Sequence, residues 1–132
     1  LPNAVIPLSP WAELDPVSES YKVNEEFDPY ISKDAIAAFK DLYINDELDV
    51  RNPYASPVYG DFDGFPPMLI QVGGREVLID DSKKIAKKAK DAGCDVSLEV
   101  WDDMVHVFHG YAPFLPEANE ALEAIGEFIV DK

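Results

Sequence analysis

Three segments of the chain carry the hydrophobic pattern of β-strands. Residues 67–73, PMLIQVG, form a continuous apolar run, which is typical of a parallel strand buried on both faces. In residues 95–102 apolar side chains alternate with polar ones, the pattern of a half-buried strand. Residues 4–9 are also apolar, and we expect a short strand there, although Pro7 cannot donate a hydrogen bond to a neighbouring strand.

Three further segments repeat apolar residues with the period of an amphipathic helix. Residues 32–44 begin with Ser32, which is a suitable N-cap, and residues 80–93 end at Gly93, a residue typical of helix carboxyl ends. Residues 116–132 form the third predicted helix. The side chains expected to face inward are Ala35, Ile36, Phe39, Leu42 and Tyr43 in the first helix, Ile85, Ala86 and Ala89 in the second, and Leu122, Ile125, Phe128 and Ile129 in the third.

The order of these segments predicts an α/β fold. Apart from irregular stretches at residues 10–31 and 45–67, strands and helices alternate, which favours a parallel β-sheet with right-handed crossovers and flanking helices. In such sheets, ligands and catalytic groups gather beyond the carboxyl ends of the strands. Residues 74–79 and 103–111 follow two of the predicted strands, so their polar side chains are the first candidates for a functional site.

Composition and charge exclude several classes of function. The 132 residues, 47% of them hydrophobic, suffice for the core of one domain. The net charge of −15 argues against nucleic acid and anionic membrane surfaces as partners, since both select basic patches. No apolar run approaches the roughly 18 to 20 residues of a membrane span, and residues 1–10 do not have the features of a signal peptide. The single cysteine, Cys94, excludes an internal disulfide and fits a reducing compartment, so we expect a cytoplasmic protein.

Side chains beyond two strand ends have the chemistry of an acid–base pair. Glu76 follows the strand at 67–73, and both histidines of the chain, His106 and His109, follow the next strand. Adjacent parallel strands lie about 4.8 Å apart, so the two loops can bring the carboxylate against the imidazole. A carboxylate on one ring nitrogen leaves the other free to accept a proton from a nucleophile. A surface ion pair is the alternative interpretation.

The second histidine, His109, raises the question of a metal site. If the stretch is helical, His106 and His109 share a face and could form half of such a site. No third ligand stands out in the sequence, and one cysteine is too few for a metal site built from several cysteines. We therefore expect no metal and no cofactor, and a packing or pocket position for His109.

Four stretches, in order along the chain, resemble a known enzyme family. They are LSPWAELD, NPYASPVYGDFDGFPPMLIQVGGREVLIDDS, AKDAGCDVSLEVWDDMVHVFHGY and LPEANEALEAIGEFI. Together they are similar to the carboxyl-terminal half of α/β-hydrolases of the hormone-sensitive-lipase-like esterase and lipase family. The resemblance implies strands six to eight of that fold, with a strand and loop at 1–11, a cap-related segment at 12–45 and the β/α core at 46–132.

The resemblance also implies a role for individual residues in hydrolysis of small carboxylic esters. Glu76 takes the position of the triad acid, with Asp80 as the alternative, and His106 that of the general base. Asp80, Asp81 and Ser82 otherwise have a simpler explanation at the start of a helix. The candidate pocket residues are Trp11, Val107 and Phe108; for Trp11 a core position is the alternative.

The family's nucleophile has no counterpart in this sequence. A G-x-S-x-G turn is expected in the family, and no serine here has glycines at both of those positions. Cys94 follows the predicted helix end at Gly93, far from the strand ends, and is no substitute. We therefore expect an isolated chain without esterase activity, which forms homo-oligomers or pairs with a complementary amino-terminal half. The competing hypothesis is a non-catalytic association module.

Overall fold

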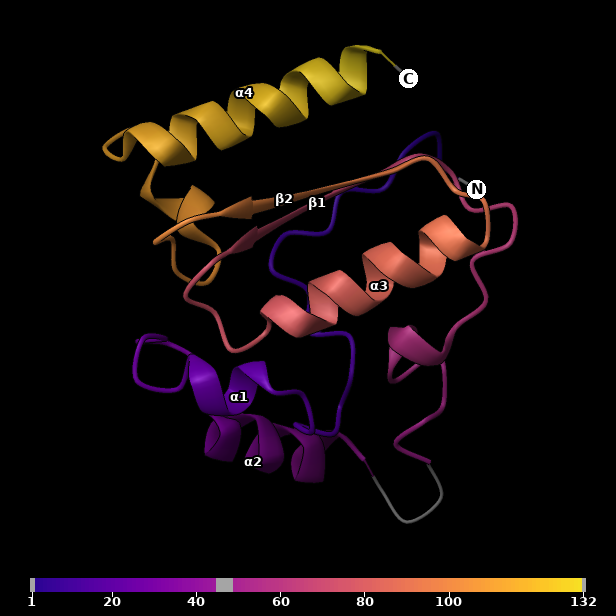
Figure 1. Ribbon diagram of the computed structural model, residues 1–132, viewed down its shortest axis with the longest axis vertical. Coiled ribbons are helices and arrows are strands. Elements are labelled where there is room, and N and C mark those ends of the chain that lie inside the picture. The colour runs from indigo at the N-terminus through magenta and orange to yellow at the C-terminus, as the bar shows by residue number, and fades with distance from the viewer. Residues whose placement is uncertain (1, 45–48, 132) are drawn as a thin grey trace.

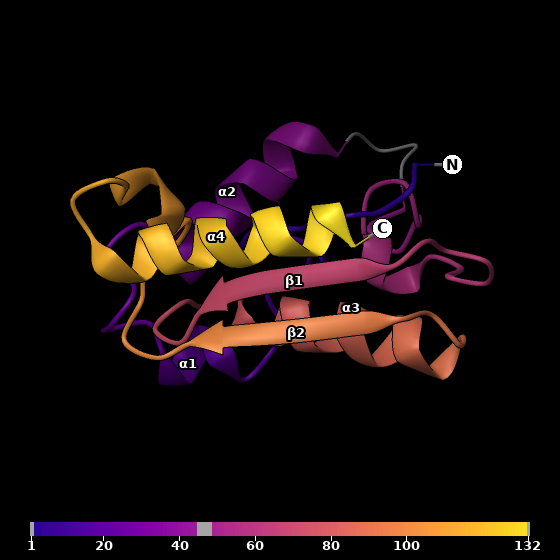
Figure 2. The same ribbon diagram turned by 90° about the horizontal axis from the view of Figure 1, so that it is seen from above.

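Two parallel strands form the centre of the computed structural model, which describes residues 2–44 and 49–131. Strand β1 (Met68–Gly73) pairs with β2 (Val96–Trp101) from Met68 opposite Val96 to Gly73 opposite Trp101. Both arrows point the same way in Figure 2, so the carboxyl ends of the strands meet at one edge. All six residues of β1 are buried, as its uninterrupted apolar run predicts. Both of these strand predictions are confirmed.

The third predicted strand, residues 4–9, lies along the other side of β1. Two isolated parallel bridges join it to β1 through Val5 and Leu8. Pro7 has no N–H, so the ladder lacks the hydrogen bond that this residue would donate, although its carbonyl still accepts from the Gln71 N–H (3.1 Å). The segment therefore has the expected place in the sheet but not a regular strand structure.

Helices cover both faces of the sheet. Helix α3 (Ile79–Asp91) lies on one face and α4 (Pro116–Val130) on the other (Figure 1). Helices α1 (Ser20–Val23) and α2 (Lys33–Tyr43) lie further from the sheet, on the α3 side. Two 3-10 turns, η1 and η2, complete the elements; they span Pro57–Tyr59 and Phe108–Tyr111. Helix α1 lies within residues 10–31, which the sequence predicts to be irregular throughout.

The largest hydrophobic cluster lies between the sheet and α3. Met68 and Ile70 of β1 pack there against the inward face of the helix, which consists of Ile85, Ala86 and Ala89. Each large aliphatic side chain buried in this way contributes about 1.5 to 3 kcal/mol. These are the three residues that the sequence predicts to face inward, and the helix prediction is confirmed, with bounds shifted by one or two residues.

Helix α4 packs through smaller residues than its sequence pattern predicts. Its buried residues are Ala118 and Ala121, which form a hydrophobic cluster with the fully buried ring of Phe108. The small alanines let the helix approach that ring closely. The expected inward positions of Leu122 and Ile129 are wrong, because these side chains are 42% and 55% exposed.

Helix α2 contacts the rest of the structure through Ile36 and through an ion pair between Lys40 and Asp15 (3.0 Å). Ser32 caps it by accepting a hydrogen bond from the Ala35 N–H (3.1 Å), as predicted. Ile36 is the buried residue of this helix and joins a second cluster formed by Tyr21, Val77, Leu78 and Trp11. The expected burial of the later apolar residues is wrong: Phe39, Leu42 and Tyr43 are 53%, 84% and 62% exposed.

The structure describes the predicted loop at 45–67 from residue 49 onward. Its first four residues, 45–48, lie outside the described residues, and so does the boundary expected between a cap-related segment and the core. From residue 49 onward the segment is irregular apart from η1. Among the described residues, no helix has the length and apolar character needed to cross a membrane.

Candidate active site

The loops that follow β1 and β2 cross each other at the carboxyl edge of the sheet. A Cβ on Gly73 would lie 2.3 Å from the Met104 carbonyl oxygen and 2.9 Å from that of Val105, so only glycine fits at this position. Beyond it, the Arg75 N–H donates to the Met104 carbonyl (3.1 Å). The close crossing brings the residues after β1 against those after β2, as the parallel sheet predicts.

Glu76 and His106 meet at this crossing. His106 Nδ1 lies 2.9 Å from Glu76 Oε2, and the Glu76 side chain is fully buried. Because an ionised carboxylate only accepts hydrogen bonds, the proton of the neutral imidazole is on Nδ1 and the lone pair on Nε2. The described residues provide no hydrogen-bond partner for Nε2, and the His106 side chain is 26% exposed. Nε2 is therefore free to accept a proton.

The other oxygen of the Glu76 carboxylate is held by two donors. Oε1 accepts hydrogen bonds from the Ser9 hydroxyl (2.5 Å) and from the Gly73 N–H (2.6 Å). The side-chain amide of Asn24 in addition donates to the backbone carbonyl oxygen of Glu76 (2.8 Å). The Ser9 and Gly73 donors compensate the burial of the charged carboxylate and fix its orientation. Sequence reasoning missed Ser9, since nothing in the local pattern links it to a residue 67 positions away.

Asp80, the alternative acid, does not contact His106. Its carboxylate accepts from the Ser20 N–H (2.9 Å) and pairs with Lys83 (3.3 Å). Burial opposes the charge of Asp80, but these two partners outweigh it and lower the pKa of the carboxyl. Asp80 thus ties α1 to the first turn of α3.

Asp81 is fully buried and binds a different segment. One of its oxygens accepts from the backbone N–H groups of Ala12 (2.8 Å) and Glu13 (2.9 Å). Burial raises the pKa of Asp81 to about 6, although those two N–H groups act in the opposite direction. Asp80 and Asp81 do lie in the first turn of α3, as expected. Their carboxylates nevertheless bind backbone groups of other segments, and the N-cap residue, Leu78, has no side-chain cap.

His109 is buried beneath α4 and has its own partner. Its Nε2 lies 2.8 Å from Gln71 Oε1, while the Gln71 amide nitrogen donates to the Glu99 carboxylate (2.8 Å). This fixes the amide orientation, so His109 Nε2 is the donor. Burial lowers the pKa of His109, which therefore stays neutral. The hydrogen bond between His109 and Gln71 joins η2 to the sheet.

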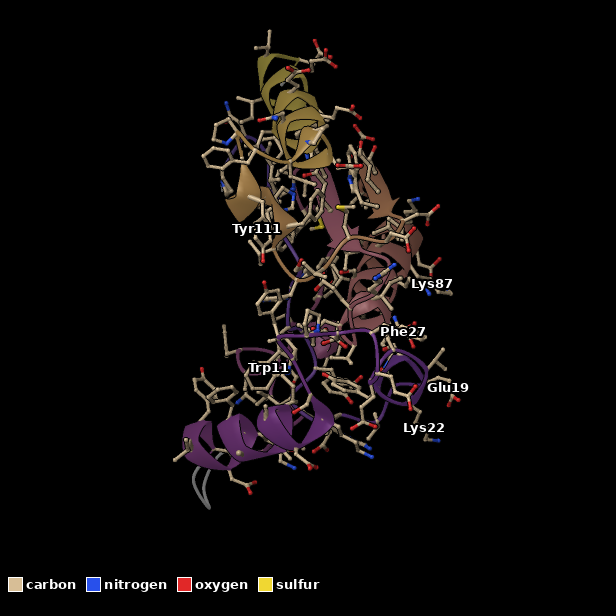
Figure 3. The ribbon with its side chains drawn as sticks, turned by 90° about the vertical axis from the view of Figure 1, so that its left-hand side faces the viewer. Trp11, Glu19, Lys22, Phe27, Lys87 and Tyr111 are labelled. Atoms are coloured by element: carbon tan, nitrogen blue, oxygen red, sulfur yellow. The ribbon has the colours of Figure 1, made fainter. Side chains whose placement is uncertain are left out.

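The three candidate pocket residues lie in different surroundings. Trp11 is half-buried between α2 and the sheet (Figure 3), where its indole N–H donates to the Glu13 carbonyl (2.8 Å). Val107, next to His106, is 37% exposed. Phe108 is fully buried, with its ring centroid 5.6 Å from that of Trp101. Only Val107 combines exposure with a position beside the acid–base pair.

Comparison with known proteins agrees with this fold. Residues 1–110 match a family with the α/β-hydrolase fold. The chain belongs to this α/β-hydrolase family, and the fold class predicted from the sequence is confirmed.

Esterases are among the relatives. The chain is 39% identical to an acetyl-hydrolase of Streptomyces hygroscopicus, over 98% of this chain and 43% of that protein. It is 37% identical to an esterase of Acinetobacter venetianus, over 97% of this chain and 42% of that protein. A crystal structure of an esterase from the bacterial hormone-sensitive lipase family superposes with a TM-score of 0.94 at 44% identity, covering 97% of this chain and 43% of the other. The chain thus spans less than half of the length of these relatives.

Proposed function

We propose that Glu76 and His106 are the acid and the general base of a serine carboxylic ester hydrolase. The nucleophilic serine and the oxyanion-binding groups are supplied by a segment outside these 132 residues. The observation that supports this role is the 2.9 Å contact between His106 Nδ1 and a fully buried carboxylate, which leaves Nε2 available. Ser9, the serine in contact with this pair, donates to Glu76 and not to His106, so it is not the nucleophile.

The proposed reaction follows from this geometry. His106 Nε2 takes the proton of the serine hydroxyl as the serine oxygen attacks the ester carbonyl carbon. The Glu76 carboxylate stabilises the imidazolium that forms, and the imidazolium then gives its proton to the leaving alcohol. A water molecule, deprotonated by the same imidazole, hydrolyses the acyl-enzyme and releases the acid. No cofactor enters the scheme.

The substrate class is small carboxylic esters. The acetyl-hydrolase and esterase relatives support this choice. Val107 is the pocket residue that we retain beside the base, because its side chain is partly exposed next to His106. Phe108 and Trp11 act first through packing, since each belongs to a hydrophobic cluster.

A serine-directed phosphonate and p-nitrophenyl acetate test the proposal on two samples. The complete polypeptide that carries this sequence should hydrolyse the ester, and its labelled serine should lie outside these 132 residues. The 132-residue chain alone should release p-nitrophenol no faster than background, because it lacks a group that can carry the acyl chain. Stoichiometric labelling of a serine within the 132 residues, with loss of activity, would contradict the proposal.

A second candidate function is association, and one observation favours it. In the segment at 4–9, Ile6 and Leu8 make no backbone hydrogen bond within residues 2–44 and 49–131. Such an edge is a template for another strand. Under this proposal the chain pairs with itself or with a complementary amino-terminal half; both roles are compatible in one protein.

A further inference from the structure

We infer that Ser9 is a positioning residue, which sets the orientation of Glu76 and of the backbone next to His106. The Ser9 hydroxyl donates to Glu76 Oε1 (2.5 Å) and accepts from the Val107 N–H (3.1 Å). The Ser9 N–H donates to the Gln71 carbonyl of β1 (2.8 Å). The buried Ser9 hydroxyl therefore links the acid to the residue that follows the base, and the Ser9 backbone N–H ties both to the central strand.

Ser9 and Val107, which this hydrogen bond joins, both have a backbone conformation that residues other than glycine rarely adopt. Ser9 has a φ of 47° and Val107 a φ of 46°. A β-branched residue such as Val107 is especially unfavourable there. Such conformations persist only where surrounding contacts fix them. The Val107 N–H bond to Ser9 is one contact that does so, directly after His106 in the chain.

The bridge explains why Glu76 presents a single oxygen to the imidazole. Oε1 is occupied by Ser9 and Gly73, so Oε2 faces His106 Nδ1. Without the hydroxyl, Oε1 loses one of its two donors and the Val107 N–H loses its acceptor. The Glu76 carboxylate and the backbone next to His106 then both become more mobile. The kinetic consequence rests on the proposed esterase function, whereas the hydrogen-bond consequence does not.

Ser56 provides a matched control for a purely structural role. It is fully buried, its hydroxyl donates to the Val50 carbonyl (2.6 Å), and it accepts from the Leu14 N–H (2.9 Å). Ser56→Ala therefore removes the same number and kind of hydrogen bonds as Ser9→Ala, except that no carboxylate is involved. Ser9→Gly is a second variant, because it removes the hydroxyl while glycine tolerates the positive φ.

The first readout is the proton NMR signal of His106 Nδ1–H, recorded on the complete polypeptide. Wild type and Ser56→Ala should show the protected, downfield signal of an imidazole bound to a carboxylate. In Ser9→Ala and Ser9→Gly this signal should broaden or disappear through faster exchange with water, while circular dichroism remains native. An unchanged signal in both Ser9 variants would overturn the inference, whether or not the protein hydrolyses esters.

The second readout is a double-mutant cycle on kcat in the same polypeptide. Ser9→Ala and Ser9→Gly should each lower kcat by about 10- to 100-fold, the cost of a displaced catalytic group. In a Glu76→Gln background, Ser9→Ala should cost less than about 3-fold, since the group through which Ser9 acts is already altered. Equal losses in both backgrounds, or an equal loss for Ser56→Ala, would show a structural role only. If wild type itself lacks esterase activity, the proposed function fails and the NMR signal still decides the role of Ser9.

Discussion

Replacing Asp81 with asparagine should change the pH dependence of folding. Asp81 is fully buried, and one of its oxygens holds the N–H groups of Ala12 and Glu13, while the other has no hydrogen-bond partner among the described residues. Asparagine keeps an acceptor oxygen for the two N–H groups but carries no charge. The comparison therefore isolates the free-energy cost of ionising a buried carboxyl.

The magnitude and sign follow from the raised pKa of Asp81. Its value in the folded chain is about 6, against 3.8 for the ordinary group. At about 1.4 kcal/mol per pKa unit, this difference is worth about 3 kcal/mol. Because the folded state holds the proton more tightly, the stability contributed by Asp81 is greatest below about pH 4 and is lost as the pH rises through about 6. Asp81→Asn should therefore gain about 2 to 3 kcal/mol relative to wild type between pH 4 and pH 7.

Urea unfolding at fixed salt, followed by circular dichroism at several pH values, measures this difference. Asp80→Asn is the matched control, since it removes the same charge from the adjacent position. The pKa of Asp80 is lowered in the folded chain, so Asp80→Asn should lose stability relative to wild type as the pH rises through the ordinary carboxyl range. A difference for Asp81→Asn that is flat with pH, or that has the same sign as the control, would refute the reasoning.

Two further predictions concern packing and association. Gly73→Ala should lower the free energy of unfolding by about 3 kcal/mol, because its Cβ would lie 2.3 Å from the Met104 carbonyl oxygen. The control Gly126→Ala in α4 should be neutral or stabilising, since its Cβ would meet nothing within 4 Å. Equal stabilities of the two variants in chemical unfolding would contradict this. Sedimentation equilibrium of the 132-residue chain at micromolar concentration should reveal species heavier than 14.7 kDa, because the backbone edge at Ile6 and Leu8 is unpaired among the described residues. A single species of 14.7 kDa would contradict the proposed association.

The regular elements were predictable because their signals are local. The apolar run of β1, the alternation in β2 and the inward face of α3 each lie within one short segment. The inward faces of α2 and α4 were predictable only in part. Ile36 is buried as predicted, but the burial of Phe39, Leu42, Leu122 and Ile129 depends on what lies opposite each helix. Hydrophobic periodicity identifies an apolar face but not the element that covers it.

The candidate site was predictable in part. Parallel strand order places Glu76 and His106 at one edge, and the structure brings them within 2.9 Å. The partners of the acid were not predictable, since Ser9 lies 67 residues away and its hydroxyl has no local signature. The role of Asp81 was missed for the same reason, because it binds the backbone at residue 12, 69 positions earlier. Contacts set by tertiary packing leave little trace in a single sequence.

The central claim is that Glu76 and His106 act as one catalytic unit, and turnover of a short-chain ester by the complete polypeptide tests it most directly. Glu76→Gln and His106→Ala should each lower kcat by about three to four orders of magnitude with the fold retained. Asp80→Asn, which alters a nearby carboxylate in the first turn of α3 without contact to His106, should cost less than about 10-fold. A severe loss for Asp80→Asn together with a mild one for Glu76→Gln would contradict the account.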